Sequence, residues 1–522
     1  MRLLGTLPSL RSSRNPLVGL GLFVLVIFAA YKAAGAILAD DLNSLALAAL
    51  LFVGGAVVIA VLNDWRKGLY LLFAWILFED FVRKYLGNNM AIYFIKDALA
   101  IVLYLSFFRA RLAKRVERFR IPFRIPLLLF FWVGLMQMFN PASTSIFFGI
   151  LGMKIYFLYV PLVYIGYALM ESEEDLRRFF SFASALILII AALGLAQAII
   201  GPSFLNPAQL QEDIRDLSTL YRVASSGAMA YRPTSVFVGA GRFQDFLQSA
   251  WLISMGYGGY LLLRSRHGRT LSAITVSVVS AASLMSTSKG VFLWTIGTAL
   301  VFTAGFLWGA PWRQREVTQV LRAIQRTAFG AGIGILLLLT VFPKELGSRL
   351  LFYSDKLMPN SPTSELMERA QSYPLANFKY AFTYPRWPYG YGIGTCSFGG
   401  QYVTRIMHAT PMHFCVESGF GNMMLELGIV GLVLWIVLGL YIGISAWKIV
   451  KELRGTPWFP LAFIIWLYAI FLFFPQMYLG GSAYQDYLLN AYLWLLLGIL
   501  YRLRSFAKAI QVVQVQAVPR RD

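Results

Sequence analysis

Long apolar blocks separated by short polar segments run along most of this chain and constrain its fold more than any other feature. A helix of about 20 apolar residues crosses the ~30 Å hydrocarbon core of a bilayer. The blocks are continuous rather than alternating, so they predict helices and not the strands of a barrel. Only 14% of the 522 residues are charged, whereas a soluble domain carries about 25%. The sequence therefore predicts an all-α polytopic membrane protein.

The apolar blocks predict about 14 transmembrane helices. The first block follows Arg2, Arg11 and Arg14, like the start of a signal peptide, but it is too long for one and more spans follow, so we interpret it as a retained helix. The predicted spans are 17–38, 44–62, 68–81, 91–108, 123–139, 148–170, 179–200, 244–263, 270–286, 290–309, 327–343, 422–446, 458–476 and 484–501.

Basic residues set the predicted orientation. Of the 46 Lys and Arg, 29 fall on the side that holds both termini, 16 fall on the other side, and Lys96 lies within a span. Because positive loops stay in the cytoplasm, both termini are predicted to be cytoplasmic. The net charge of +21 is thus explained by short basic clusters between apolar blocks. This distribution argues against a nucleic-acid partner and makes the lipid bilayer the expected surroundings.

One long segment on the predicted outer side, 343–421 between spans eleven and twelve, contains amphipathic and aromatic stretches. Loops of this length with structure of their own usually carry function. The chain accordingly divides into N-terminal helices (1–143), a core that includes this loop (144–446), and C-terminal helices with a tail (447–522). Both cysteines, Cys396 and Cys415, lie in the loop. In an oxidising compartment they could form a disulfide, or they could remain two unpaired small residues.

Four basic residues at the predicted outer face are candidates for binding an anion. Arg232 and Arg242 flank a glycine-rich approach to a helix, and a guanidinium fork and a helix N-terminus both favour phosphate. Lys289 stands in a short turn of small residues, and Lys154 begins another span. The ordinary alternative is that these side chains reach lipid headgroups.

Acidic and imidazole groups near the end of the outer loop are candidates for a general base. Glu417 is predicted at the membrane surface and Glu426 about two turns into span twelve, where a carboxylate should face the protein interior. His413, one of three histidines, precedes them. The ordinary alternatives are a solvated loop histidine and a buried carboxylate that pairs with a cation or caps backbone groups.

Taken in order, four short motifs resemble the O-antigen ligase/polymerase superfamily of bacterial inner-membrane glycosyltransferases. They are Arg232-x-x-Ser-x-Phe237, Ser286-x-Ser-Lys289-Gly290, Gly390-Tyr-Gly392-Ile-Gly394 and Glu417-Ser-x(7)-Glu426-x-Gly428. The resemblance implies a periplasmic-face enzyme that uses an undecaprenyl-diphosphate-linked oligosaccharide as donor, without metal or other cofactor. It implies that Arg232 and Lys289, with Arg242 and Lys154, hold the pyrophosphate, and that a flippase and a chain-length regulator are potential partners.

One departure from the ligase pattern bears on the choice of reaction. Ligases of this superfamily typically carry a His-Asn pair eleven residues before the glycine of the Glu-x-Gly step, and here that position is Glu417-Ser418. This favours a polymerase of O-antigen or exopolysaccharide repeat units over a ligase, although His413 would serve after a four-residue shift. A lipid-linked oligosaccharide flippase is the main alternative of another class. The long outer loop and the absence of an evident half-to-half repeat argue against it.

Overall fold

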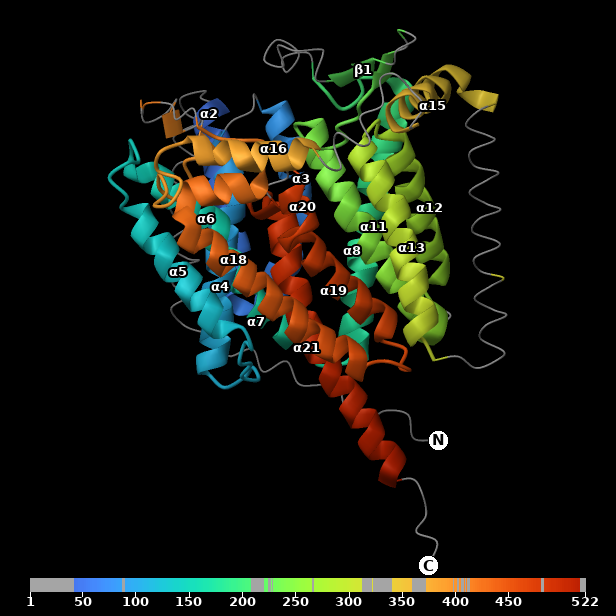
Figure 1. The fold of residues 1–522 in the computed structure, drawn as a ribbon. Coiled ribbons are helices and arrows are strands. Elements are labelled where there is room, and N and C mark those ends of the chain that lie inside the picture. The colour runs from blue at the N-terminus through green and yellow to red at the C-terminus, as the bar shows by residue number, and fades with distance from the viewer. Residues whose placement is uncertain are drawn as a thin grey trace, which may run out of the picture. The chain divides into compact units, whose positions relative to one another are not determined.

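The computed structural model of the chain is mostly helical (Figure 1). It describes residues 42–86, 90–207, 220–223, 227, 229–264, 267–311, 322, 340–358, 372–397, 399–400, 403–404, 408, 410, 414–479 and 483–516. The described chain divides into two compact units. One comprises Met1–Phe73 and Ile95–Val116, and the other Ala74–Phe94 and Glu117–Asp522. Helices α3 (Trp65–Tyr85) and α4 (Met90–Leu112) each contribute to both.

The smaller unit is built from α2 (Leu42–Asn63) and the portions of α3 and α4 that belong to it. Trp65 packs edge-to-face on Phe107, with ring centroids 5.3 Å apart. The Ser106 hydroxyl donates to the Leu62 carbonyl over 3.2 Å. The aromatic pair joins α3 to α4, and the partly buried hydrogen bond joins α4 to α2.

The larger unit holds the remaining elements. They are α5 (Arg124–Met138), α6 (Ile146–Phe157), α7 (Leu162–Leu169), α8 (Glu173–Ile200), β1 (Tyr221–Val223), β2 (Met229–Tyr231), α11 (Ala240–Arg264), α12 (Arg269–Met285), α13 (Lys289–Gly309), α15 (Pro343–Leu357), α16 (Tyr373–Tyr380), η2 (Ala381–Thr383), α18 (Gly419–Glu452), α19 (Phe459–Phe473), α20 (Pro475–Tyr478), η3 (Ala483–Gln485) and α21 (Tyr487–Gln516). The most extensive contacts between helices are those of α7 with α21, of α8 with α12, and of α11 with both α12 and α19. A core of large apolar side chains lies among them.

Local sequence explains where several helices begin. At α8, Ser172 and Asp175 form a reciprocal capping box, and Glu173 and Glu174 place negative charge in the first turn, where the helix dipole favours it. At α18, the Ser418 hydroxyl accepts from the Gly421 amide over 3.1 Å. Both helices therefore start at a side chain that satisfies an otherwise unpaired amide.

Five stretches of described helix are long and apolar enough to cross a membrane. They are Ile146–Leu169, Glu173–Ile200, Lys289–Gly309, Gly419–Glu452 and Phe459–Tyr478. Helices also cover the other predicted spans except the first, which lies outside the described residues, and the eleventh, of which only the last few residues are described. The prediction of a mostly helical chain is confirmed, and these five stretches have the length and composition that a membrane crossing requires.

Two elements from outside the predicted spans lie at one end of the α11–α13 helices in the larger unit (Figure 1). One is the antiparallel hairpin of β1 and β2, in which Tyr221 pairs with Tyr231. The other is α15, which contacts both β2 and α13. This end of the unit carries several of the candidate site residues.

Candidate functional site

The segment that follows Arg232 is held by buried side chains from two helices. The Gln197 side-chain oxygen of α8 accepts from the amides of Thr234 (2.8 Å) and Ser235 (2.7 Å). The Lys84 ammonium of α3 donates to the Thr234 hydroxyl (3.0 Å) and the Ser235 carbonyl (2.8 Å). Ser235 adopts a left-handed φ of 51°. A non-glycine residue in this region is unusual, and such strain persists only where the surroundings enforce it.

The structure brings the segments of Arg232 and Lys289 together. The hydroxyl of Thr287, two residues before Lys289, donates to the carbonyl of Tyr231, next to Arg232, over 2.9 Å. Thr287 also has a left-handed φ, 54°, which is a marked outlier for a β-branched residue. The pKa of Arg232 is lowered to about 10 by burial and, secondarily, by the nearby guanidinium of Arg222. We call this contact between the two motifs the cationic junction.

Arg349 of α15 was not predicted as a site residue from the sequence. It connects the cationic junction to helices α8 and α12. It is 1% exposed, and its guanidinium donates to the carbonyls of Met285 (3.0 Å), Ala198 (3.2 Å) and Tyr231 (3.1 Å). These carbonyls belong to the ends of α12, α8 and β2. Burial lowers the pKa of Arg349 to about 10. One side chain of α15 therefore joins three separate elements.

Arg242, a candidate for binding the pyrophosphate, is engaged by a carboxylate of the protein. Its guanidinium lies 2.7 Å from Asp80, whose side chain is fully buried, and packs over the Tyr487 ring at 5.1 Å. Asp80 also accepts from the Val238 amide over 3.3 Å, just before α11 begins. An internal carboxylate thus occupies the helix start that the sequence suggested for a phosphate. The role of Arg242 towards a ligand stays a prediction, and its nearest anion is Asp80.

Lys154 of α6 lies against aromatic faces. Its ammonium is 4.4 Å from the centroid of the Tyr93 ring and 4.7 Å from that of Phe94. Tyr93 packs edge-on against Tyr487, with centroids 6.2 Å apart. Lys154 and Arg242 therefore flank one pair of tyrosine rings. This arrangement differs from the cationic junction, because the ring faces themselves attract the cations.

Helix α18 is broken within its predicted span, and the Gly390–Gly394 motif fills the break. Gly428 has a φ of 72°, and the carbonyl of Pro388 accepts from the Ile429 amide over 3.1 Å. The Gly392 amide donates to the Glu426 carbonyl over 3.1 Å. A Cβ at Gly390 would lie 2.7 Å from that carbonyl, which is too close for any other residue. A break in an apolar helix is tolerated when another segment satisfies its polar backbone groups, as the Pro388 and Gly392 groups do here.

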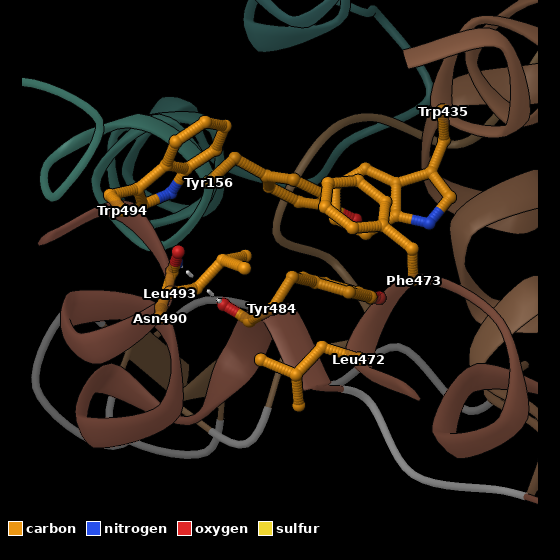
Figure 2. Close-up of a pocket in the computed structure, with 8 residues that line it drawn as sticks. All are labelled: Tyr156, Trp435, Leu472, Phe473, Tyr484, Asn490, Leu493 and Trp494. Atoms are coloured by element: carbon orange, nitrogen blue, oxygen red, sulfur yellow. Dashed lines mark hydrogen bonds between the residues drawn. The ribbon is translucent and has the colours of Figure 1, made fainter. Parts of the chain in front are cut away.

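The side chain of Glu426 reinforces the same break. It is fully buried and accepts from the Tyr156 hydroxyl (2.7 Å) and the Cys396 amide (2.8 Å). Tyr156 in turn stacks on Tyr484 at 4.3 Å and borders a small cavity with Trp435 (Figure 2). The free volume of this cavity is about 10 Å³, close to the least that one water molecule needs. Glu426 is therefore held as an internal acceptor, and the cavity beside it is too small for a sugar.

Cys396 and Cys415 form a disulfide, the alternative that an oxidising compartment would favour. Their Cα atoms are 5.3 Å apart, and the bond closes a loop with a sequence separation of 19. Cys396 is buried, and its carbonyl accepts from the Gln485 side chain over 3.1 Å. The disulfide therefore ties Cys396, which closely follows the Gly390–Gly394 motif, to Cys415, which lies just before α18.

Replacing both Cys396 and Cys415 by serine is expected to lower the thermal unfolding midpoint of the purified protein. Closing a loop of about this length stabilises a protein by roughly 3 kcal/mol. Intact-mass measurement after alkylation without reductant should show no modified cysteine in the wild type. Two alkylated cysteines in protein kept in an oxidising buffer would contradict the bond, and an unchanged midpoint in the double variant would contradict its contribution to stability.

The remaining candidates for a general base differ in position. Glu417 is exposed and immediately precedes the capping residue Ser418 at the start of α18. His413 lies outside the described residues. Of the two carboxylates that were predicted as general-base candidates, Glu417 is exposed to solvent and Glu426 is buried. Within the part of the chain that the structure describes, no three histidine, cysteine, aspartate or glutamate side chains are grouped as metal ligands would be.

Hydrogen bonds, an ion pair and a ring contact connect these parts into one continuous region of the larger unit. The cationic junction reaches α3 through Lys84 and Thr234, and α3 reaches Arg242 through Asp80. Tyr487, the first residue of α21, packs beside Arg242. Two residues earlier, Gln485 of η3 donates to the Cys396 carbonyl. Arg242, the cationic junction with its Arg232 and Lys289 segments, and the helix break that holds Glu426 thus lie along a shared framework.

Comparison with known proteins identified no relative. No family model matches the chain, and neither the curated proteins nor the solved structures contain a match to it.

Proposed function

We propose that this protein is an inner-membrane glycosyltransferase that polymerises undecaprenyl-diphosphate-linked oligosaccharide repeat units, of O-antigen or exopolysaccharide, at the periplasmic face. The proposal keeps the fourteen-span arrangement with both termini in the cytoplasm and the segment 343–421 outside. It rests on the resemblance of the four motifs and on one geometric observation: the contact of Thr287 with the Tyr231 carbonyl, which joins the segments of Arg232 and Lys289.

The cationic junction has the chemistry that a pyrophosphate requires. Arg232 is partly buried with another guanidinium nearby, and its burial, followed by repulsion from Arg222, lowers its pKa to about 10. A bound dianion would reverse that repulsion, and a guanidinium fork matches phosphate oxygens. The strained backbone at Ser235 and Thr287 fixes the approach of both segments before a ligand arrives. These features support a preorganised anion site.

The proposed reaction needs no group beyond the two substrates and the chain. The acceptor hydroxyl oxygen bonds to the anomeric carbon of the donor sugar, and the bond from that carbon to the phosphate oxygen breaks. The cationic junction stabilises the charge that develops on the leaving pyrophosphate. The hydroxyl proton passes to a base, for which exposed Glu417 is our first candidate and His413 the second. We assign Glu426 a positioning role, because it is enclosed by Tyr156 and Cys396.

Deletion of the gene followed by glycan gel analysis tests this proposal. A polymerase deletion is expected to leave single repeat units on the acceptor or on the lipid carrier. A ligase deletion would instead accumulate polymer on the carrier, and a flippase deletion would leave the carrier-linked unit on the cytoplasmic side. Polysaccharide of unchanged length and attachment would contradict both transferase readings.

A further inference from the structure

A groove between α18 and α19 combines an apolar wall with basic residues at one end, and the proposed glycosyltransferase activity does not use it. Its volume is about 240 Å³, and it is lined by Leu440, Gly443, Ile444, Trp447, Trp466 and Ile470. Leu440 and Ile444 are 51% and 59% exposed. All of its described walls belong to helices long and apolar enough to cross a membrane. Such a groove would face acyl chains.

Aromatic contacts give the groove a fixed form. The Trp447 ring packs on Trp466 with centroids 4.5 Å apart and stacks on Trp308 of α13 at 5.6 Å. The Trp466 indole donates to the Gly443 carbonyl over 3.2 Å. The absence of a side chain at Gly443 allows Ile470 to approach closely, since an added Cβ would lie 2.6 Å from it. The groove is therefore built by specific contacts between three helices.

The apolar face of α18 continues directly into a basic surface. Leu440, Ile444, Lys448 and Lys451 follow one another at helical spacings of three and four, so they lie on one face of α18. Both lysines are exposed. Just beyond the helix, the guanidinium of Arg454 lies 4.6 Å from the Trp308 ring centroid. The nearby Glu452 carboxylate is paired with Arg504 over 2.9 Å. Positive charge thus predominates where the groove ends.

From this continuity of an apolar groove with exposed cations, we infer that the α18–α19 groove binds one anionic phospholipid. An acyl chain lies along Leu440, Ile444 and Trp466, and the phosphate of the headgroup lies among Lys448, Lys451 and Arg454. A neutral lipid would match the groove but not its basic end. Anionic lipid recognition by basic residues beside apolar helix surfaces follows from membrane electrostatics. The orientation predicted from the sequence puts these cations on the cytoplasmic side.

Native mass spectrometry of the purified, detergent-solubilised protein can test this site with phosphatidylglycerol and phosphatidylcholine of identical acyl chains. The wild type is expected to bind phosphatidylglycerol more tightly. Each basic residue near a membrane surface contributes about fivefold in affinity. Lys448→Ala with Lys451→Ala is therefore expected to weaken phosphatidylglycerol binding by roughly 10-fold or more, and adding Arg454→Ala should weaken it further. Leu440→Trp, which fills the groove, should weaken binding of both lipids.

The matched control removes three exposed cations elsewhere, by Lys114→Ala, Arg115→Ala and Arg118→Ala, and should leave the affinity within about twofold. Thermal midpoints without added lipid check that every variant is folded. Equal affinity of the wild type for the two lipids would overturn the inference. So would an equal loss in the control and the lysine variants, which would indicate non-specific attraction, or unchanged phosphatidylglycerol binding by folded Leu440→Trp.

Discussion

Cells that carry Arg232→Ala or Lys289→Ala are expected to make no detectable polymer, while the variant protein accumulates normally in the membrane. Both residues lie in the segments joined at the cationic junction. Removing one preorganised group that stabilises a developing charge typically slows a reaction by about 10²–10³-fold. Arg232→Lys should retain partial activity, because an ammonium keeps the charge but lacks the planar fork. Glycan gels report polymer length, and immunoblots of membranes report the amount of protein.

Lys379→Ala is the matched control, since it removes an exposed cation of α16 in the predicted outer segment 343–421. It should leave the polymer unchanged. Wild-type polymer from Arg232→Ala or from Lys289→Ala would remove that residue from the proposed site. Accumulation of single repeat units with Lys379→Ala as well would indicate that charge in the outer segment matters generally, and would contradict a specific junction.

The helices could be predicted from the sequence because each depends on local composition. Span 244–263 corresponds to α11 (Ala240–Arg264) and span 290–309 to α13 (Lys289–Gly309). The differences are at the ends, where Ser288 caps α13 by accepting from the Val291 amide. The break in α18 was not predicted, because Gly428 in an apolar run is compatible with a continuous helix. Backbone contacts with Pro388 and Gly392, which are remote in sequence, account for the break.

The candidate site could be predicted only in part, for the same reason. The sequence indicated that Arg232 and Lys289 matter, but not that a threonine between them joins their segments. It treated Arg242 as a ligand-binding cation, because Asp80 is remote in sequence and their ion pair leaves no local pattern. Arg349 did leave a signal. It shares the buried face of amphipathic α15 with Leu346, Phe352 and Tyr353, and an arginine on such a face needs partners.

Arg349→Ala is expected to destabilise the protein and to eliminate polymer together. The substitution leaves the carbonyls of Ala198, Tyr231 and Met285 without the guanidinium that now donates to them. The Tyr231 carbonyl keeps the Thr287 hydroxyl as a donor, so the loss falls mainly on the carbonyls of Ala198 and Met285. An unsatisfied buried acceptor costs about 1–3 kcal/mol, so the combined loss is at least about 2 kcal/mol. The thermal midpoint of purified protein should fall by about 2 °C or more, because the shift per kcal/mol shrinks as the chain grows longer. Arg349→Lys should recover little, because a single ammonium does not span three carbonyls in fixed positions.

Lys344→Ala, an exposed change on the same helix, provides the control and should preserve both the midpoint and the polymer. Two outcomes would separate the possible roles of Arg349. If the protein is destabilised but polymer of normal length persists at permissive temperature, Arg349 stabilises α15 without positioning the cationic junction. If neither property changes, the guanidinium bonds to Tyr231 and Met285 do not hold the outer segment in place. Loss of polymer at a temperature where the variant remains folded is the result expected of a positioning residue. The geometry favours it, because the Tyr231 carbonyl accepts from both Arg349 and Thr287, and so couples α15 directly to the segments of Arg232 and Lys289.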